Sequence, residues 1–473
     1  MNLPAQIGVY RTGYDRAELR TGMVHLGYGA FHRGHQAVYL DDCMEATGDL
    51  SWGIAAVNLR RSESAGFARR NPMLDGYALK TMAPDGQADL RLVRAHTRFL
   101  DWPETPEPAE ALLADAGVHA VTVTVTESGY SLATDGALNI EDPVIAAELA
   151  GAQPRSVYGY LARALERRRQ AGGAPVTLLC CDNIRENGLV LERAFLAYLV
   201  ATGRDRLADW VRARASFPCS MVDRITPRAT PDLAREVEAR MPGYGADAIH
   251  GEAFSQWVLE DRFAGPMPDL SRAGVEIVTQ VHPYEEAKIR ILNGGHTALA
   301  YLAALSGYQT FDQAMRDPGL RAHFEAWQRA EVLPGLTLDL PFDKAAYLTT
   351  IAQRFENAAI ADHLERICMD GYSKMALYVR PTLAACLGQG IAPVAGYRSI
   401  ASWYVFARLA AAGRCPIPYR EPCWSALAPL LAPGRQQEFA RAPQIWGDLP
   451  QRHAGFVPGL CTALEEMDRQ WPM

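Results

Sequence analysis

The chain has 473 residues, more than one compact core usually holds, and this length predicts two domains. Hydrophobic residues make up 49% and charged residues 21%, as in ordinary soluble globular proteins. The formal net charge of −7 argues against a nucleic-acid partner, because phosphate binding needs a basic surface, but it leaves room for a local basic pocket.

Neither a targeting segment nor a membrane span is expected. The N-terminal stretch MNLPAQIGVYRTGYDR has no apolar core of the signal-peptide type, and no apolar run approaches the roughly 20 residues that a spanning helix needs. The nine cysteines are scattered and contain no Cys-x-x-Cys spacing. Most thiols should therefore be small core side chains of a reduced, cytoplasmic enzyme.

The first half of the chain alternates strand and helix patterns. An apolar run at 23–26 ends in Gly27-Tyr28-Gly29, an amphipathic stretch follows to Gly48, and a second apolar run covers 52–57. Strand, turn, helix and strand in this length have the size of a βαβ unit. Further strands are expected at 119–126, 175–182 and 275–281, and helices at 107–114, 155–171 and 188–202. The alternation predicts an α/β fold with a Rossmann-type, doubly wound, mostly parallel sheet.

The pattern changes near residue 282. From Pro283 onward the apolar spacing is close to 3.6 residues, and no convincing strand is present. We therefore place one domain at residues 1–282 and a mainly α-helical domain at residues 283–473. Helices in the second domain are expected at 283–305, 310–332, 355–368, 373–387, 396–412 and 457–469.

The glycine turn GYGAFHRGH (27–35) lies where a dinucleotide-binding loop would lie, after the first strand and before a helix. Gly27 permits a tight turn, and Gly29 lets the backbone approach a pyrophosphate. His32 replaces the third glycine of the G-x-G-x-x-G pattern, so the pattern alone is a weak signal and its position is the stronger one. We expect domain 1–282 to bind a dinucleotide through Gly27, Gly29, Ala30, Phe31 and Arg33.

The segment AKIRILNGGHTALA (287–300) has a helical pattern with three polar residues, Lys288, Asn293 and His296, among apolar ones. Oxidation of a secondary alcohol without a metal needs a base for the hydroxyl proton, and burial suits a lysine to this task by penalising its charged form. An asparagine amide can stabilise the developing alkoxide, and a histidine can orient a neighbouring hydroxyl. On an ideal α-helix the three residues lie within an arc of about 140° and can face one cleft. Gly294 and Gly295 would let a ligand approach this helix closely.

Seven motifs are spread along most of the chain. They are GYGAFHRGHQAVYLDD (27–42), TVTESGY (124–130), CDNIRENG (181–188), MVDRITP (221–227), GEAFSQWVLED (251–261), PYEEAKIRILNGGH (283–296) and RICMDGYSKM (366–375). Taken together, the motifs resemble the mannitol dehydrogenase family, the polyol-specific long-chain dehydrogenases, and among its members most closely the D-arabinitol 4-dehydrogenases. The resemblance implies a zinc-independent oxidoreductase of carbohydrate metabolism that transfers hydride between a polyol and NAD. D-Arabinitol to D-xylulose is the expected reaction, or mannitol to fructose.

The resemblance also implies roles for individual residues. Lys288 is the expected general base, and Asn293 with Asn183 are the expected donors to the alkoxide. The substrate is expected to contact His296, Asn183, Arg366 and Lys374.

Three acidic residues have secondary roles in this interpretation. The resemblance places Glu127 in proton movement between the base and bulk water, although it could simply cap the turn at Ser128-Gly129. It places Asp223 near the nicotinamide ribose, although an ion pair with Arg224 is the alternative. Glu285 lies one helical turn before Lys288, and either tunes the lysine or favours the helix N-terminus.

The cofactor preference has mixed signals. A carboxylate usually follows the second strand of an NAD-binding fold, but this chain has Asn58 there, and its first acidic residue is Glu63. Asn58 can bond a ribose hydroxyl, and Arg60 and Arg61 could bind the 2′-phosphate of NADP or be solvated loop residues. Because the resemblance implies NAD, we expect NAD with weak discrimination against NADP.

Three other functions were weighed. A metal-dependent dehydrogenase is disfavoured because His32 and His35 belong to no set with zinc-ligand spacing. A non-enzymatic sugar sensor is disfavoured because the Lys-x4-Asn-x2-His element is intact. A fructuronate or tagaturonate type of sugar-acid reductase stays open, since Arg366, Lys374 or Arg380 could bind a carboxylate. The expected partner is a small polyol or ketose, and the expected assembly is a monomer or a weak homo-oligomer.

Overall fold

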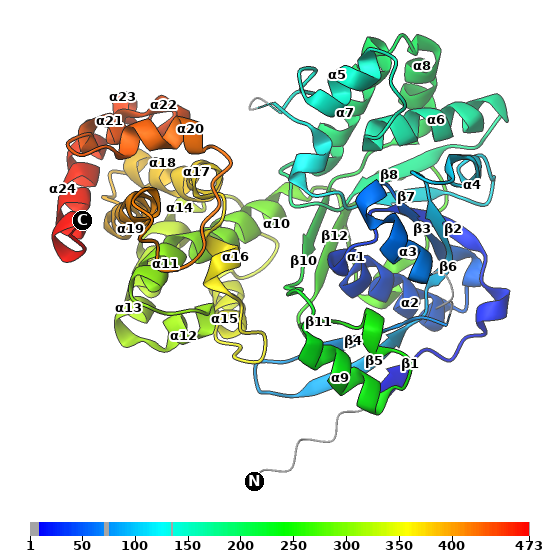
Figure 1. Cartoon of the computed structure of the whole chain (residues 1–473), viewed down its shortest axis with the longest axis horizontal. Coiled ribbons are helices and arrows are strands. Elements are labelled where there is room, and N and C mark those ends of the chain that lie inside the picture. Colours follow the sequence, from blue (N-terminus) through cyan, green and yellow to red (C-terminus); the bar gives the residue numbers. More distant parts are fainter. Residues whose placement is uncertain (1–8, 71–74, 134–135, 473) are drawn as a thin grey trace. The chain divides into compact units, whose positions relative to one another are not determined.

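The computed structural model describes residues 9–70, 75–133 and 136–472. The chain divides into two compact units, residues 1–83 with 87–282 (unit 1) and residues 84–86 with 283–473 (unit 2). In Figure 1 the described strands lie in the blue-to-green part of the chain, and the later part is built from helices. The predicted fold class, a Rossmann-type sheet followed by a mainly helical part, is confirmed.

Unit 1 is built on a six-stranded sheet in which every neighbouring pair is parallel. Its order is β6-β3-β2-β7-β8-β9, so the chain runs to one side of β2 first and then to the other. Ligands of open α/β sheets bind at the carboxyl ends of the strands where the order reverses, which is here beside β2. The strands are β2 (Thr21–Leu26), β3 (Gly53–Asn58), β6 (His96–Asp101), β7 (Ala120–Val123), β8 (Val176–Cys180) and β9 (Ala215–Ser216).

The apolar runs at 23–26, 52–57, 119–126 and 175–182 are confirmed as the central strands β2, β3, β7 and β8. All residues of β3, β7 and β8 are buried, which explains their apolar character. The strand expected at 275–281 is reduced to the largely exposed β13 (Glu276–Val278) and lies outside this sheet.

Two smaller sheets in unit 1 were not predicted. One has the order β1-β5-β4-β11, and the other has the order β10-β12-β13. Their strands are short, and in β4 and β5 a charged side chain interrupts the apolar residues, so the apolar signals are weak. The strands are β1 (Val9–Arg11), β4 (Tyr77–Met82), β5 (Ala88–Val93), β11 (Ile249–Glu252), β10 (Ser220–Asp223) and β12 (Gln256–Glu260).

The helix expected after the glycine turn is interrupted. The short α1 (Ala30–Gly34) ends at His35, whose φ of −129° and ψ of −90° are not helical, and α2 (Gln36–Thr47) then runs to Gly48. Other helices of unit 1 are α3 (Ser64–Arg70), α4 (Pro106–Leu112), α5 (Pro143–Leu149), α6 (Val157–Gln170), α7 (Asn187–Ala201), α8 (Asp205–Arg214) and α9 (Pro231–Arg240).

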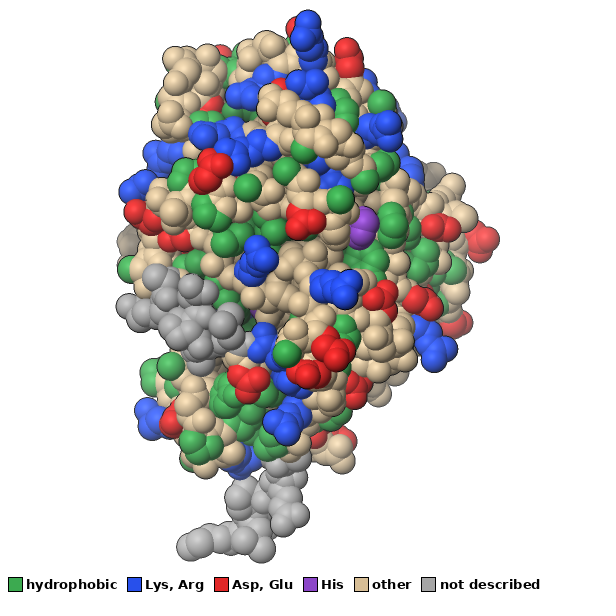
Figure 2. All heavy atoms as spheres, turned by 90° about the vertical axis from the view of Figure 1, so that its right-hand side faces the viewer, with side chains coloured by type: hydrophobic (Ala, Val, Ile, Leu, Met, Phe, Trp, Pro, Cys, Tyr) green, Lys and Arg blue, Asp and Glu red, His purple; other side chains and the backbone are tan. Residues whose placement is uncertain are grey.

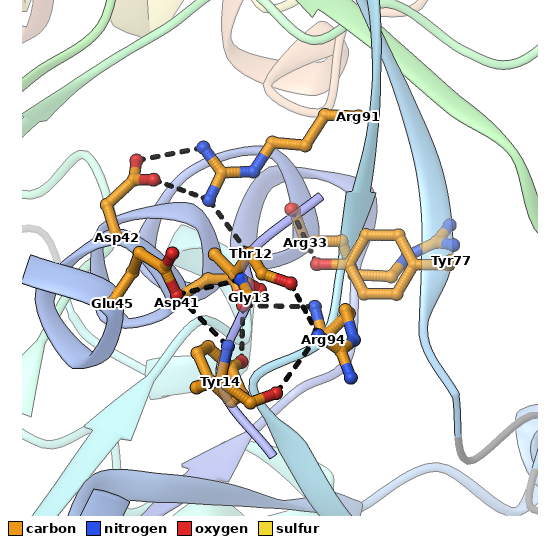
Figure 3. A network of polar contacts seen from close by, with 10 residues as sticks. All are labelled: Thr12, Gly13, Tyr14, Arg33, Asp41, Asp42, Glu45, Tyr77, Arg91 and Arg94. Atoms are coloured by element: carbon orange, nitrogen blue, oxygen red, sulfur yellow. Dashed lines mark hydrogen bonds and ion pairs between the residues drawn. The ribbon is translucent and has the colours of Figure 1, made fainter. Parts of the chain in front are cut away.

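A polar network joins α2 to the β4–β5 hairpin (Figure 3). Arg91 of β5 donates to the carboxylates of Asp41 and Asp42 on α2, at 2.7 and 2.6 Å. The Tyr77 hydroxyl of β4 donates to the Arg33 carbonyl oxygen of α1 at 2.6 Å. These bonds hold the helices that follow the glycine turn against the β1-β5-β4-β11 sheet.

Unit 2 packs its helices around one apolar core, and the only β pairing among its described residues is the bridge between Thr310 and His363. The long run α10 (His282–Ala287), η7 (Lys288–Asn293) and α11 (Gly294–Leu305) lies in this core, and η7 is a π-helical segment. The other helices are α12 (Phe311–Arg316), α13 (Pro318–Ala326), the π segment η8 (Trp327–Val332), α14 (Leu333–Gly335), α15 (Lys344–Phe355), α16 (Leu364–Cys368), α17 (Gly371–Lys374), the π segment η9 (Met375–Val379), α18 (Arg380–Gly388), α19 (Val394–Ala411), α20 (Trp424–Leu427), α21 (Gln436–Arg441), α22 (Pro443–Trp446), α23 (Leu449–Arg452) and α24 (Phe456–Gln470).

The helix predicted at 355–368 is wrong over its first half. α15 ends at Phe355, and α16 begins only at Leu364. Between them the Asn357 side chain accepts the Ala359 N–H, and Ala361 adopts a left-handed φ of 46°. These local turns outweigh the apolar spacing that favoured a helix. Among the described residues, none of the helices combines the length and apolarity needed to cross a bilayer.

Candidate active site

The glycine turn between β2 and α1 borders a cavity of 290 Å³ in unit 1. Gly27 has a φ of +96°, and a Cβ there would lie 1.9 Å from the Thr124 carbonyl oxygen, so only glycine fits. A Cβ at Gly29 would meet no atom closer than the Gly27 oxygen, at 4.0 Å. The backbone is therefore open at Gly29, which fits the approach of a dinucleotide pyrophosphate.

Most of the predicted cofactor residues line this cavity. They are Gly27, Gly29, Ala30, Arg33, Asn58 and Arg60. Phe31 and Asp223 are absent from the described lining: Phe31 stacks on His35, and Asp223 is buried at the end of β10. The lining also includes residues to which the sequence assigned no cofactor role. These are Tyr28, Leu59, Glu63, Phe67, Thr124, Val125 and Thr126.

His32, at the position of the missing third glycine, is fully buried. Its ring stacks on that of His25 from β2, with centroids 3.3 Å apart, and its Nε2 lies 3.0 Å from Nε2 of His96. Burial lowers the pKa of His32 and His96 well below the usual range and that of His25 to about 3, so all three rings are neutral near pH 7. His25 Nε2 lies 2.8 Å from the Gly27 carbonyl oxygen. An imidazole stack thus joins the helix, the strand and the turn where a third glycine would allow direct packing.

Arg33 is neither solvated nor available to a phosphate alone. It is buried, and its Nη1 lies 3.0 Å from Asp247 Oδ1. Its guanidinium also lies over the rings of Tyr28 and Tyr77, at 5.3 and 5.4 Å from their centroids. A phosphate in the cavity would share Arg33 with the Asp247 carboxylate.

Asn58 ends β3 beside an acidic residue that the sequence analysis did not place. Its Nδ2 donates to Asp101 Oδ1 at 3.0 Å and to the Arg60 carbonyl oxygen at 2.9 Å. Ser64 donates to the same Asp101 oxygen at 3.1 Å. Asp101 lies at the end of β6, 43 residues after Asn58 in the sequence. No local sequence pattern connects two residues so far apart.

A second cavity of 490 Å³ adjoins the first, because Leu59 and Arg60 line both. Its other described walls include Trp102 and several prolines, together with the basic residues Arg61, Arg155 and Arg163. Arg61 pairs with Glu104 at 3.1 Å and Arg163 with Glu110 at 2.8 Å. A local basic pocket therefore exists despite the net charge, and Figure 2 shows Lys and Arg side chains gathered in the upper part of one face.

Glu127 and Asn183 follow the neighbouring parallel strands β7 and β8, and both are exposed. The partly buried Asp182 joins the loops that follow β7 and β8, and no sequence pattern indicated this role. Its carboxylate accepts the Val125 and Thr126 N–H groups at 2.8 and 3.2 Å and the Tyr130 hydroxyl at 2.7 Å. Burial raises the pKa of Asp182 to about 6, even though these bonds favour the charged form.

In unit 2, Lys288 and Asn293 are the first and last residues of η7, and both are buried. The prediction of an ideal α-helix, with these two residues about 140° apart, is wrong here. A π-helix has i→i+5 hydrogen bonds, so residue i+5 lies over residue i, as i+4 does in an α-helix. Lys288 and Asn293 are five residues apart and therefore share one face of the helix.

The expectation that Gly294 and Gly295 admit a ligand is wrong. A Cβ at Gly294 would lie 3.2 Å from the Tyr378 carbonyl oxygen, and one at Gly295 would lie 2.4 Å from Gln328 Nε2. The space beside both glycines is filled by other residues of unit 2. The glycine pair therefore allows close packing of neighbouring helices against the segment.

His296 lies one turn beyond Asn293 and is partly buried. Its ring stacks on Phe355 with centroids 4.1 Å apart and meets the edge of Phe311 at 4.6 Å. Burial lowers the pKa of His296 well below the usual range, and the nearby charges of Arg366, Arg354 and Lys374 lower it further. His296 is thus a neutral hydrogen-bonding ring near pH 7, close to both predicted substrate cations.

Arg366 and Lys374 are each anchored. Arg366 Nε donates to Asp362 Oδ1 at 2.9 Å, and Lys374 Nζ donates to the Ile367 carbonyl oxygen at 2.8 Å. Glu285 is buried in α10, one turn before Lys288. Glu285, Lys288, Asn293 and His296 thus lie on one helical run, and the charges of Arg366 and Lys374 lie near His296.

His32 and His35 do not form the beginning of a metal site. His32 Nε2 faces His96, and His35 Nε2 lies 2.8 Å from the Gln256 carbonyl oxygen. In the part of the chain that the structure describes, no three His, Cys, Asp or Glu side chains form a group that could hold a metal ion. The independence from zinc stays a prediction.

Two family models match the chain. The mannitol dehydrogenase Rossmann domain matches residues 21–272, and the mannitol dehydrogenase C-terminal domain matches residues 280–468. The chain belongs to the mannitol dehydrogenase family. This membership confirms the resemblance drawn from the glycine turn and the Lys-x4-Asn-x2-His element.

Three members of the family illustrate the similarity. A D-arabinitol 4-dehydrogenase of Ralstonia nicotianae is 36% identical over 437 residues, which cover 91% of this chain and 93% of the relative. A polyol:NADP oxidoreductase of Gluconobacter oxydans is 37% identical over 390 residues, covering 81% and 79%. The solved structure of Pseudomonas fluorescens mannitol 2-dehydrogenase in a ternary complex with NAD and D-mannitol matches with a TM-score of 0.86 at 30% identity, covering 98% of this chain and 94% of that one.

Proposed function

We propose that this chain oxidises a secondary hydroxyl of a sugar alcohol to a ketone with NAD, and that its reaction is D-arabinitol to D-xylulose. The observation that carries the proposal is the π segment η7, which places Lys288 and Asn293 on one buried face. The similarity to a D-arabinitol 4-dehydrogenase along almost the whole of both chains supports this substrate. Mannitol to fructose is the second candidate, supported by the similarity to a mannitol 2-dehydrogenase.

The residues of unit 2 carry out the proton chemistry. Lys288 takes the proton of the hydroxyl that is oxidised, the carbon–hydrogen bond breaks, and its electron pair leaves with the hydrogen as hydride. NAD, when bound, supplies the nicotinamide carbon that accepts this hydride. The Asn293 amide donates to the substrate oxygen while it carries negative charge. The neutral His296 ring, with Arg366 and Lys374 around it, orients the neighbouring hydroxyls.

The residues of unit 1 hold the cofactor. The open backbone at Gly29 takes the pyrophosphate, and Asn58 takes a ribose hydroxyl. We propose weak discrimination against NADP, because Asn58 carries no charge and four arginines line the adjoining cavity. The roles expected of Asn183, Glu127 and Asp223 stay predictions.

A substrate panel tests the proposal. Purified protein is offered D-arabinitol, D-mannitol, D-sorbitol and xylitol with NAD⁺ or NADP⁺, and fructuronate and tagaturonate with the reduced cofactors, and absorbance at 340 nm is followed. We expect the highest kcat/KM with D-arabinitol, and D-xylulose as its product by chromatography. Turnover of the sugar acids alone would overturn the polyol assignment.

A further inference from the structure

The π segment η7 has a side-chain partner from a distant part of unit 2. Gln328 of η8 donates through Nε2 to the Ile291 carbonyl oxygen at 2.7 Å, across 37 residues of sequence. Both residues are fully buried. The same oxygen also accepts the Gly294 N–H, so two donors meet on one carbonyl in the middle of the segment that carries Lys288 and Asn293.

A side-chain donor at this carbonyl favours the π form. An i→i+5 turn shifts the bonding pattern by one residue, and the Gly294 N–H accordingly donates to Ile289, five residues earlier. In a regular α-helix the Ile291 oxygen would accept the Gly295 N–H instead. Bonds from outside the helix stabilise such irregular turns, because they replace a bond of the regular ladder.

A buried glutamine at position 328 would lower the stability of the folded protein if it served only to fill space. Its Oε1 is buried and has no hydrogen-bond partner among the described residues. A half-bonded amide in a core is less stable than an apolar side chain of similar size. Gly295 provides the room for it, since a Cβ there would lie 2.4 Å from Gln328 Nε2. The glutamine and the glycine are thus matched to each other and to the Ile291 oxygen.

We propose that Gln328 is a positioning residue that holds η7 in its π form and so keeps Lys288 and Asn293 on one face. Without it, the segment relaxes toward an α-helix, in which the two side chains diverge by about 140°. The effect on the helix follows from the structure alone, and the effect on turnover rests on the proposed function.

Gln328→Met tests this, because methionine keeps most of the volume and lacks the donor. The crystal structure of the variant should show residues 288–293 shifted toward α-helical hydrogen bonds. With D-arabinitol, kcat should fall by about 10- to 100-fold, the loss expected for a misplacement near 1 Å. The KM for NAD should be unchanged, because the glycine-turn cavity belongs to unit 1.

Two further variants keep the test decisive if Gln328→Met folds poorly. Gly295→Ala displaces the amide without altering Gln328 and should lower kcat to a similar extent. Gln328→Glu can donate only when protonated, so the ratio of its kcat to that of the wild type should rise as pH falls. A merely structural role for Gln328 would not produce this pH dependence.

Phe439→Leu is the control for general destabilisation, since the ring of Phe439 packs against those of Trp403, Tyr404 and Trp446 in the core. It should lower the melting temperature and leave kcat unchanged. An unaltered π segment in Gln328→Met would overturn the inference, as would a shifted segment with wild-type kcat. If the wild type oxidises no polyol, the proposed function fails, but the crystal structure of the variant still decides what Gln328 does to the helix.

Discussion

Replacing Gly29 with alanine should impair cofactor binding without impairing folding. The φ of −90° and ψ of 175° at Gly29 suit alanine, and its Cβ would meet nothing closer than 4.0 Å. The free energy of unfolding should therefore change by less than about 0.5 kcal/mol, as for substitutions that touch no neighbour. The added methyl group occupies the open side of the turn, where we expect the pyrophosphate.

The size of the binding defect follows from the contact that the methyl group blocks. A hydrogen bond from a backbone N–H to a charged phosphate contributes about 1.5–3 kcal/mol. Losing one such bond should raise the Kd for NADH by about 10- to 150-fold. The assay is a titration of NADH fluorescence, with the melting temperature measured on the same samples.

Gly27→Ala is the matched variant with the opposite outcome. The φ of +96° and the 1.9 Å approach to the Thr124 oxygen force the backbone of the turn to move. Strain and overpacking of this kind cost about 1–3 kcal/mol each, so the melting temperature should fall clearly. A Gly29→Ala protein that binds NADH like the wild type, or a Gly27→Ala protein as stable as the wild type, would refute this account of the turn.

Four further results are expected. Lys288→Ala should lower kcat by at least about 10³ without changing the Kd for NADH, and a loss of less than about tenfold would contradict its role as base. Prolonged EDTA or dipicolinate treatment should leave activity intact, whereas a loss that zinc restores would overturn the metal-free mechanism. The double change Arg61→Ala and Arg155→Ala should weaken the binding of 2′,5′-ADP relative to that of 5′-AMP by about three- to tenfold, because solvent screens these charges. Arg212→Ala, which removes a charge elsewhere, should leave this ratio unchanged. Because burial raises the pKa of Asp182 from 3.8 to about 6, the native state binds more protons than the unfolded state in this interval. The contribution of Asp182 to the free energy of unfolding should therefore fall as pH rises from 4 to 6, so the stability difference between wild type and Asp182→Asn should change over this interval in thermal scans, and a difference that is constant with pH would refute the assignment.

Four strands of the central sheet, β2, β3, β7 and β8, could be predicted from the sequence because they are buried on both faces and give short, mostly apolar runs. β6 and β9 were not predicted, because β6 mixes polar and apolar residues and β9 has only two residues. The strands of the two smaller sheets could not be predicted in this way. In β5, for example, Arg91 lies between Leu90 and Leu92, because it bonds to carboxylates on α2. A tertiary ion pair thus removed the apolar signal that would have identified the strand.

Only some residues of the cavity beside the glycine turn could be predicted from the sequence, because others come close to it only through strand pairing. Gly27, Gly29 and Asn58 occupy positions that follow directly from the strand-turn-helix order. Asp101 meets Asn58, and Asp182 meets the Val125 N–H of the cavity lining, only after the parallel strands have paired. Their contacts depend on strand order, which local sequence does not encode.

The π segment shows most clearly where local reasoning ends. The pattern around Lys288 and Asn293 correctly indicates a helix whose polar residues can face one cleft, but it does not reveal the π segment that brings these two residues onto one face. What moves them together is a hydrogen bond from Gln328 to Ile291, with Gly295 making room for it. From the sequence, the glycine pair indicates an opening for a ligand, whereas in the structure it accommodates this bond and the Tyr378 backbone. The spacing of Lys288 and Asn293 is therefore a property of three packed helices, and a change in any of them that releases the Ile291 oxygen should act on the same two side chains.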